Sequence, residues 1–402
     1  MKKIGINLIP FLLTIFIIYL SYNGQLWLNF WATLNISPVI PPFSDLDSIL
    51  KTLLSRNFGF NVYLENPYDP THGVYLYPSI WLDIFEFLKL STQIYFKAFN
   101  FIIIFIYFFI IQDLYIKNTK KIFRIFMIIF FFSTTNFLIL ERLNIEIIIF
   151  SLIYFATISK NYFLKVFFFI FALAGKVFPI FSIFLFIKNK KQFLLIFVLS
   201  FSYLLFIREE IYFMSVNIIE YARIFAYGSG SVAKAMYYFS KEYNLFINDE
   251  NYIYLKLSIV FLFATIAIIL IKINFVFGKK KLHKDMNLED RLFLAGGGIY
   301  LGTFIFSANV DYRLVFLLLT FTYILNINNL LIKYIYIFSC TMIFNSFFFE
   351  IQGGDPYSIR YYNVASFIYS LKFIIFVIIC YYFGSVINKY LKINPKKINF
   401  NI

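Results

Sequence analysis

The sequence predicts an all-α protein that crosses a membrane many times. Of its 402 residues 61% are hydrophobic and only 14% are charged, which is more apolar surface than one soluble core can bury. Apolar runs approach about 20 residues, the length that spans a bilayer. They recur from residue 4 to the C-terminal region without a long soluble stretch between them. We therefore expect a single integral membrane domain over residues 1–402.

Basic residues border the apolar runs and set the expected orientation. Lysine and arginine collect on the cytoplasmic side of a membrane. The basic clusters lie at residues 2–3, 117–124, 188–191, 272–291 and 389–397. We expect these clusters and both termini in the cytoplasm, with the chain in the cytoplasmic (inner) membrane of a bacterium. The same rule accounts for the formal charge of +15, so no nucleic-acid partner is expected.

About twelve transmembrane or re-entrant helices satisfy this orientation. The first two are expected near residues 4–23 and 96–116. Four short helices follow near 125–140, 145–158, 162–175 and 177–187. The last two of these are too short to cross fully, which favours a re-entrant hairpin packed inside the protein. The remaining helices are expected near 192–207, 253–271, 292–308, 314–328, 333–350 and 364–388.

Two long loops then face the outer side, at residues 24–95 and 208–251. The first is acidic and aromatic, and residues 46–54 have the apolar spacing of an amphipathic helix at the membrane surface. Most acidic residues of the chain fall on this outer side. Because acidic residues contribute little to orientation, their position indicates an outer-face site for chemistry or ligand binding.

The first outer loop carries two kinds of candidate residue. Asp45 and Asp47 follow two consecutive prolines. A carboxylate held there can act as a general base toward an attacking hydroxyl; alternatively, one of them caps the following helix, since aspartate is a favoured N-cap. Further on, Tyr75, Tyr77 and Trp81 offer aromatic faces that suit a sugar and equally suit the membrane interface.

A polar island at residues 141–146 interrupts two apolar runs. It contains Glu141, Arg142, Asn144 and Glu146. Polar groups at membrane depth usually face the protein interior or water, which makes them candidates for a functional site. The alternative is a simple exposed turn.

Two further cationic positions stand at helix junctions. Lys176 lies alone between apolar stretches and needs an anionic partner, which a phosphate, Glu141 or Glu146 would supply. The island at residues 309–313 includes Asp311, Tyr312 and Arg313. The planar fork of an arginine suits a phosphate or a carboxylate, so Arg313 is expected to bind a phosphate or to pair with Asp311.

Several chemistries have no support in the sequence. Cys340 and Cys380 lie inside apolar runs, and the chain has only two histidines, so neither a disulfide framework nor a zinc site is predicted. No phosphate-binding loop and no Ser-His-Asp arrangement is present. No cofactor is implied, and dependence on a divalent metal stays an open question.

The polar islands, taken in order, resemble the multi-spanning glycosyltransferases of the C-type fold. The likeness is to the family 87-like, polyprenyl-phosphate-mannose-dependent transferases and their bacterial relatives. The residues that carry it are Asp45 with Leu46, residues 66–70 leading to 77–81, and residues 141–146, 176–179 and 309–313. One departure is Leu143, where related sequences tend to have glycine.

The resemblance implies a role for each group of residues. Asp45 would be the base that activates the acceptor hydroxyl, with Asp47 as the second choice. The expected phosphate contacts are Arg142, Lys176 and Arg313. The expected sugar or acceptor contacts are Tyr75, Tyr77 and Trp81, and the rest of the expected substrate site consists of Glu141, Asn144, Asp311 and Tyr312.

The activity implied is transfer of a hexose, with mannose favoured, and with inversion at the anomeric carbon. The donor would be a polyprenyl-phosphate-linked sugar anchored among membrane lipids, and the acceptor a glycan or glycolipid on the outer face. Two other interpretations remain. An O-antigen or exopolysaccharide polymerase typically relies on arginine-rich outer loops later in the chain, and a flippase-type transporter predicts a continuous polar path across the bilayer.

Overall fold

A computed structural model describes most of the chain. The described ranges are residues 2–69, 73–118, 120–217, 224–242, 251–277, 286–306, 309–346, 348–349 and 359–390. Within them the protein is mostly helical, and the two strands have two residues each. This confirms the expected all-α class.

The helices follow the predicted apolar runs closely. The first half of the chain forms α1 (Lys2–Ser21), α2 (Gly24–Thr33), α3 (Ser44–Asn57), α4 (Ile80–Phe87), α5 (Gln93–Lys117), α6 (Lys121–Phe131), α7 (Thr134–Arg142), α8 (Glu146–Ile158), α9 (Tyr162–Gly175) and the 3₁₀ helix η1 (Phe178–Phe186). The second half forms α10 (Lys190–Phe206), α11 (Arg208–Asn217), β1 (Ala226–Tyr227), α12 (Ser229–Glu242), α13 (Tyr252–Phe277), α14 (Leu288–Phe306), β2 (Asn309–Val310), the 3₁₀ helix η2 (Asp311–Leu317), α15 (Leu318–Ile324), α16 (Leu330–Phe344) and α18 (Ile359–Tyr390).

Fewer helices than expected are long and apolar enough to cross a membrane alone. Among the described residues three qualify, at Gln93–Lys117, Tyr252–Phe275 and Asn363–Tyr390. The number rises to five if each of two bent helix pairs counts as one span. The first pair, within α1 and α2, bends by 118°, and the second, α6 with α7, by 49°. The predicted hairpin at 162–187 is α9 followed by η1.

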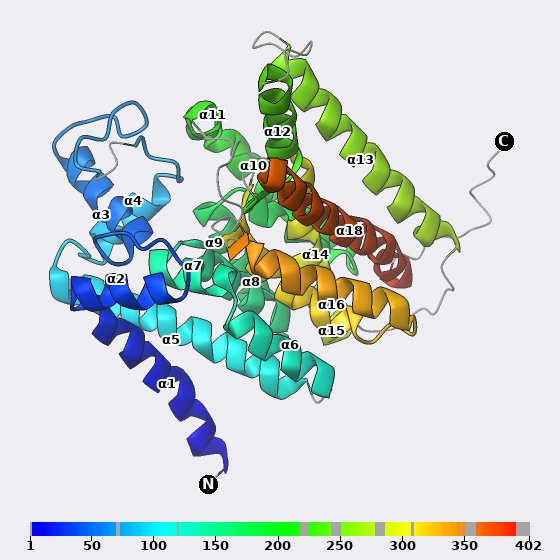
Figure 1. The fold of residues 1–402 in the computed structure, drawn as a ribbon, viewed down its shortest axis with the longest axis horizontal. Helices are drawn as coiled ribbons and strands as arrows, with labels where there is room; N and C mark the ends of the chain where they lie inside the picture. Colours follow the sequence, from blue (N-terminus) through cyan, green and yellow to red (C-terminus); the bar gives the residue numbers. More distant parts are fainter. Residues whose placement is uncertain are drawn as a thin grey trace.

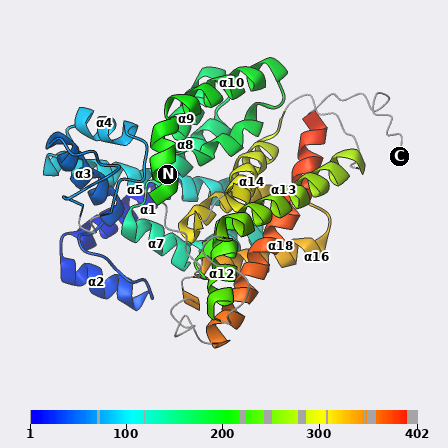
Figure 2. The ribbon, with the colours of Figure 1, turned by 90° about the horizontal axis from the view of Figure 1, so that it is seen from above.

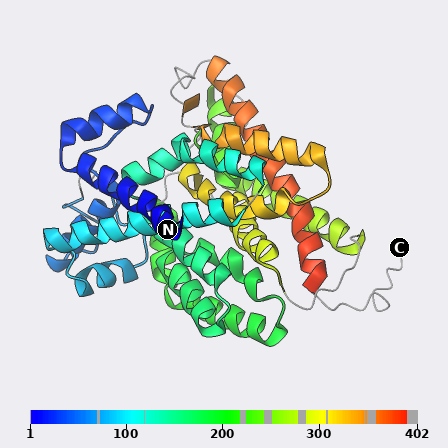
Figure 3. The ribbon, with the colours of Figure 1, turned by 90° about the horizontal axis from the view of Figure 1, so that it is seen from below.

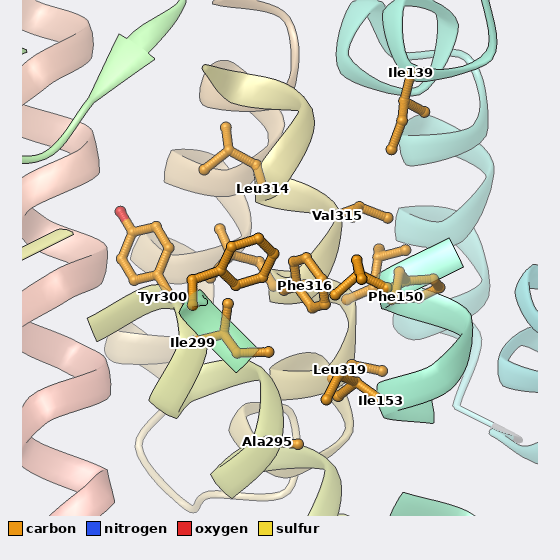
Figure 4. Packing of buried hydrophobic residues seen from close by; sticks show 14 of the residues in the cluster. Ile139, Phe150, Ile153, Ala295, Ile299, Tyr300, Leu314, Val315, Phe316 and Leu319 are labelled. Carbon is orange, nitrogen blue, oxygen red and sulfur yellow. The ribbon is translucent and has the colours of Figure 1, made fainter. Parts of the chain in front are cut away.

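The core lies around α14, which is central in the views from above and below (Figures 2 and 3). This helix is buried along nearly its whole length, so it is apolar on every side. Figure 4 shows its residues Ile299 and Tyr300 packed beside Phe316 of η2 and Phe150 of α8. Glycines allow this close packing: a Cβ at Gly296 would lie 2.3 Å from the carbonyl oxygen of Phe316.

The first outer loop is folded, as expected, and its helices α2, α3 and α4 stand together at one side of the molecule (Figure 1). The side chain of Asn66 joins two parts of this loop. Its amide nitrogen donates a hydrogen bond to Thr52 Oγ1 at 2.8 Å, and its amide oxygen accepts one from Ser55 Oγ at 2.6 Å. Arg56 of α3 pairs with Asp83 and Glu86 of α4, at 2.6 and 2.9 Å. These bonds give the loop a fixed shape.

The second outer loop contributes α11, β1 and α12; its residues 218–223 and 243–250 lie outside the described ranges. Strand β1 pairs antiparallel with β2, with Ala226 opposite Val310 and Tyr227 opposite Asn309. This short ladder brings the second outer loop against the polar island at 309–313.

Candidate functional site

A cavity of about 670 Å³ lies where both outer loops meet the helix bundle. Its lining comes from segments far apart in the sequence, including α3, α7, η1, α11 and α14. Six of the twelve residues predicted for the site line it: Asp45, Tyr77, Arg142, Lys176, Tyr312 and Arg313. A volume of this size is typical of small-molecule sites.

Asp45 is the carboxylate in this cavity. It lies in the first turn of α3, whose N-terminus has no side-chain cap, so the capping role considered for Asp45 is wrong. Asn144 Nδ2 donates a hydrogen bond to Asp45 Oδ2. Burial raises the pKa of the Asp45 carboxyl, while the bond from Asn144 and the nearby cations Arg142 and Lys176 oppose the rise. A base with an elevated pKa holds a proton more strongly.

Asn144 reaches Asp45 through an unusual turn. The residue before it, Leu143, has φ 45° and ψ 51°, in the left-handed region. This conformation costs most residues about 1–2 kcal/mol and is free for glycine, which explains why a glycine suits this position. Leu143 adopts it with its side chain fully buried, so packing holds the strained backbone in place.

Lys176 and Arg313 share one carboxylate, which belongs to Glu146. Lys176 Nζ and Arg313 Nε each lie 2.7 Å from Glu146 Oε1. Glu146 is fully buried, and Lys176 is 8% exposed. Burial lowers the pKa of Lys176 to about 8, against the opposite effect of Glu146. Two cations thus share the carboxylate of Glu146, and Asp45 is a second anion in the same cavity.

Arg142 provides the third cation. Its Nε lies 2.9 Å from Glu141 Oε2, and Glu141 Oε1 accepts a hydrogen bond from the backbone of Val39 at 2.8 Å. The guanidinium also donates to Ser44 Oγ and to the carbonyl of Ser37, both at 3.3 Å. Arg142 therefore joins the cavity to the start of α3, whereas Glu141 is buried behind it.

Aromatic rings complete the polar half of the cavity. The ammonium of Lys176 lies 4.9 Å from the ring centroid of Tyr77, within the range of a cation–π contact. Burial raises the pKa of the Tyr77 phenol well above its ordinary value, so this hydroxyl stays neutral. The Arg313 guanidinium lies 5.1 Å from the ring of Phe178.

Six predicted residues lie outside the cavity lining: Glu141 and Asn144, described above, and Asp47, Tyr75, Trp81 and Asp311. Asp47 is on α3 but does not line the cavity with Asp45. Tyr75 is buried behind Tyr77, with ring centroids 5.7 Å apart. Trp81 is 2% exposed, and its indole Nε1 donates to the carbonyl of Gly175 at 2.8 Å. Asp311 pairs with Lys372 of α18 and not with Arg313.

Other cavity features were not predicted from the sequence. The apolar wall consists of Leu76, Leu138, Phe178, Phe181, Ile211, Met214, Phe225 and Phe306. Outside the lining, Glu210 of α11 accepts hydrogen bonds from Tyr63 Oη at 3.0 Å and from Ser79 N and Oγ at 2.9 and 2.7 Å. Its charge at the start of an outer-loop helix was the available signal, but only the folded chain shows its partners.

Comparison with known proteins does not identify a function for this site. No family model matches the chain, and no curated protein or solved structure does. Among the described residues, no group of three or more His, Cys, Asp or Glu side chains is placed to hold a metal ion.

The arrangement combines two chemical capacities. Asp45 can accept a proton from a hydroxyl. Lys176, Arg313 and Arg142 can bind an anion and stabilise negative charge that grows on a leaving group. The apolar wall formed by residues such as Phe178 and Phe306 can hold hydrocarbon. A ligand that fits all three parts has a hydroxyl-bearing partner, an anionic group and an apolar portion.

Proposed function

We propose that the protein is a membrane glycosyltransferase that moves a hexose, with mannose favoured, from a polyprenyl-phosphate donor to a glycan or glycolipid acceptor. The observation that carries the proposal is the presence of one carboxylate, Asp45, in the same cavity as Arg142, Lys176 and Arg313. The site would face the outside of a bacterial cytoplasmic membrane and serve polysaccharide biosynthesis, within a C-type fold of about twelve transmembrane or re-entrant helices.

The reaction is a single displacement with inversion. Asp45 takes the proton of the acceptor hydroxyl while that oxygen forms a bond to the anomeric carbon. The bond between the anomeric carbon and the phosphate oxygen breaks, and its electron pair leaves with the polyprenyl phosphate. Lys176 and Arg313 stabilise the negative charge on that phosphate, and no redox partner is needed.

The cationic side chains around the cavity support a phosphate ligand. Glu146 balances one of the two cations Lys176 and Arg313, which contact the same carboxylate oxygen, and Glu141 balances Arg142. With Asp45 ionised as the base, the three cations are matched by three carboxylates, so the phosphate would be held by the N–H donors of Lys176, Arg313 and Arg142 and not by an excess of positive charge. Tyr77 and Tyr312 would contact the sugar or the acceptor.

The apolar parts of the molecule support a lipid-linked donor. Phe181 and Phe306 lie in the wall of the cavity, and Phe306 is 59% exposed. Apolar helices long enough to cross a membrane occur in the same chain. A donor whose hydrocarbon tail stays in the bilayer would reach the cations without leaving the membrane.

Sugar transfer in isolated membranes tests the proposal. Membranes carrying wild type, Asp45→Asn or Asp47→Asn at matched protein levels receive radiolabelled polyprenyl-phosphate mannose and native acceptor extracts. Loss of a general base reduces turnover by about 100-fold or more, so this loss is expected for Asp45→Asn. Asp47→Asn is the matched control, because Asp47 is on the same helix but does not line the cavity.

Two results would contradict this function. Transfer by Asp45→Asn at the wild-type rate would remove Asp45 as the base. Absence of transfer by wild type from several polyprenyl-phosphate hexoses would favour a polymerase or a flippase-type transporter instead.

A further inference from the structure

Lys372 is a cation buried in the middle of α18. Its side chain is fully buried, and Asp311 is 1% exposed. The ammonium nitrogen lies 2.9 and 3.0 Å from the two carboxylate oxygens of Asp311. Burying both charges is costly, and apolar residues of similar volume often stabilise a protein as well or better. An ion pair inside a candidate span therefore calls for an explanation beyond stability.

The same ammonium also binds the backbone of the second outer loop. Lys372 Nζ donates to the carbonyl oxygens of Ile224 and Ala226, at 2.6 and 3.0 Å. From the other side, the backbone N–H of Asp311 donates to the carbonyl of Phe225 at 2.8 Å. Tyr361, also on α18, accepts a hydrogen bond from the N–H of Ile224 at 3.3 Å. The segment 224–226 is thus held on both sides by one ion pair and its neighbours.

The residues fixed in this way belong to the cavity. Phe225, Tyr312 and Arg313 line it, and Arg313 is two positions after Asp311. We propose that Lys372, acting through Asp311 and the segment 224–226, is a positioning residue that places Arg313 and Phe225 for donor binding. The expected effect on donor binding rests on the proposed function, whereas the expected placement of the segment 224–226 does not.

A purely stabilising pair and a positioning pair predict different results when both charges are removed. If the pair only balances charge, the variant Lys372→Met with Asp311→Leu should keep the site, because no unpaired charge remains. If the pair positions the segment, the same variant folds but loses the bonds to Ile224 and Ala226. Methionine and leucine cannot donate or accept those bonds.

The first measurement is the KM for polyprenyl-phosphate mannose, in detergent, for wild type and the double variant. We expect KM to rise by about tenfold or more, because misplacing a binding group by about 1 Å has effects of this size, with a smaller change in kcat. The matched control is Lys389→Met, on the same helix α18, which breaks an ion pair with Asp290 of α14. Neither residue lines the cavity, so KM should stay unchanged.

The second measurement does not depend on activity. A thiol is introduced by Phe225→Cys, and its rate of labelling by a water-soluble maleimide is compared with and without the double variant. Labelling of the native Cys340 and Cys380 should be slow, because both are fully buried. We expect labelling at position 225 to be severalfold faster when Lys372 and Asp311 are replaced.

The outcomes separate the two proposals. Faster labelling without any transfer by wild type would keep the positioning role and refute the glycosyltransferase. Unchanged labelling together with unchanged KM would overturn the positioning role. If the double variant does not fold, Lys372→Gln carries the test, since it removes the ammonium that binds Ile224, Ala226 and Asp311; unchanged labelling in that variant would also overturn the proposal.

Discussion

Replacing Gly175 by alanine should displace Lys176 without changing any charge. A Cβ at position 175 would lie 2.7 Å from Trp81 Cζ2 and 2.9 Å from Ile149 Cδ1. Overpacking of this kind costs about 1–3 kcal/mol. We expect the upper part of that range, because the buried indole of Trp81 is tied to the Gly175 carbonyl at 2.8 Å and cannot move aside without breaking this bond.

The free energy of unfolding can be measured by denaturant titration in detergent micelles, in a double-mutant cycle with Trp81→Phe. Trp81→Phe alone should cost at least about 1 kcal/mol for the lost hydrogen bond. It also removes the ring atom nearest the new methyl group, so Gly175→Ala should cost less in that background. Equal costs of Gly175→Ala in both backgrounds, or a cost below about 0.5 kcal/mol in wild type, would refute the role given to this contact.

Three other predictions follow from the same contacts. The pH profile of kcat/KM should rise as Asp45 loses its proton, at a pH above the usual aspartate range because burial raises the pKa of this carboxyl. It should fall near pH 8 as Lys176 loses its proton. A flat profile from pH 5 to 9 would contradict both assignments. Glu210→Ala should cost about 1 kcal/mol in detergent unfolding, because it removes the acceptor of three hydrogen bonds from half-buried donors. The exposed neighbour Glu209→Ala should change little, and equal effects would show that the three bonds to Glu210 do not hold α11. Arg142→Lys keeps the charge but cannot reproduce the contacts of the guanidinium to Ser44 and Ser37, so KM for the donor should rise by about tenfold. An unchanged KM would show that donor binding does not need the planar guanidinium of Arg142.

Much of the helical architecture could be predicted from the sequence. The apolar runs predicted the helices of the bundle because their interruptions coincide with real helix ends, such as Arg142 and Gly175. The helices α2, α4, α11 and α12 in the two long loops were not predicted. The number of spans was harder to predict. Composition does not report the bend of 118° between α1 and α2, because such a bend depends on how the flanking helices pack.

The candidate site could be predicted in its composition but not in its pairings. Asp311 and Arg313 are neighbours in sequence, yet they lie in a 3₁₀ helix of three residues per turn, where positions i and i+2 point in different directions. The same argument applies to Asp45 and Asp47 on α3, since residues two apart on an α-helix do not share a face. Only one member of each pair lines the cavity.

The role of Trp81 could not be predicted from the sequence for a different reason. An aromatic residue in an outer loop suits a sugar contact, but a buried indole N–H needs an acceptor. The partner it finds, the carbonyl of Gly175, is 94 positions away and could not be identified from spacing. Trp81 therefore supports the backbone beside Lys176 and does not form the cavity wall.

The cavity lining runs from Asp45 to Arg313, but Lys372, near the C-terminal end, holds one segment of it, and this has a consequence for biogenesis. Asp45 enters the membrane region early in synthesis, whereas Lys372 is made after about nine-tenths of the chain and holds the segment beside Arg313. A ribosome-bound chain that has inserted its first helices thus has Asp45 before the residue that holds the segment beside Arg313 has been made. The cavity of the nascent protein would stay incomplete until α18, its last described helix, has docked, so a truncation before α18 should leave the segment 224–226 without its bonds to Lys372.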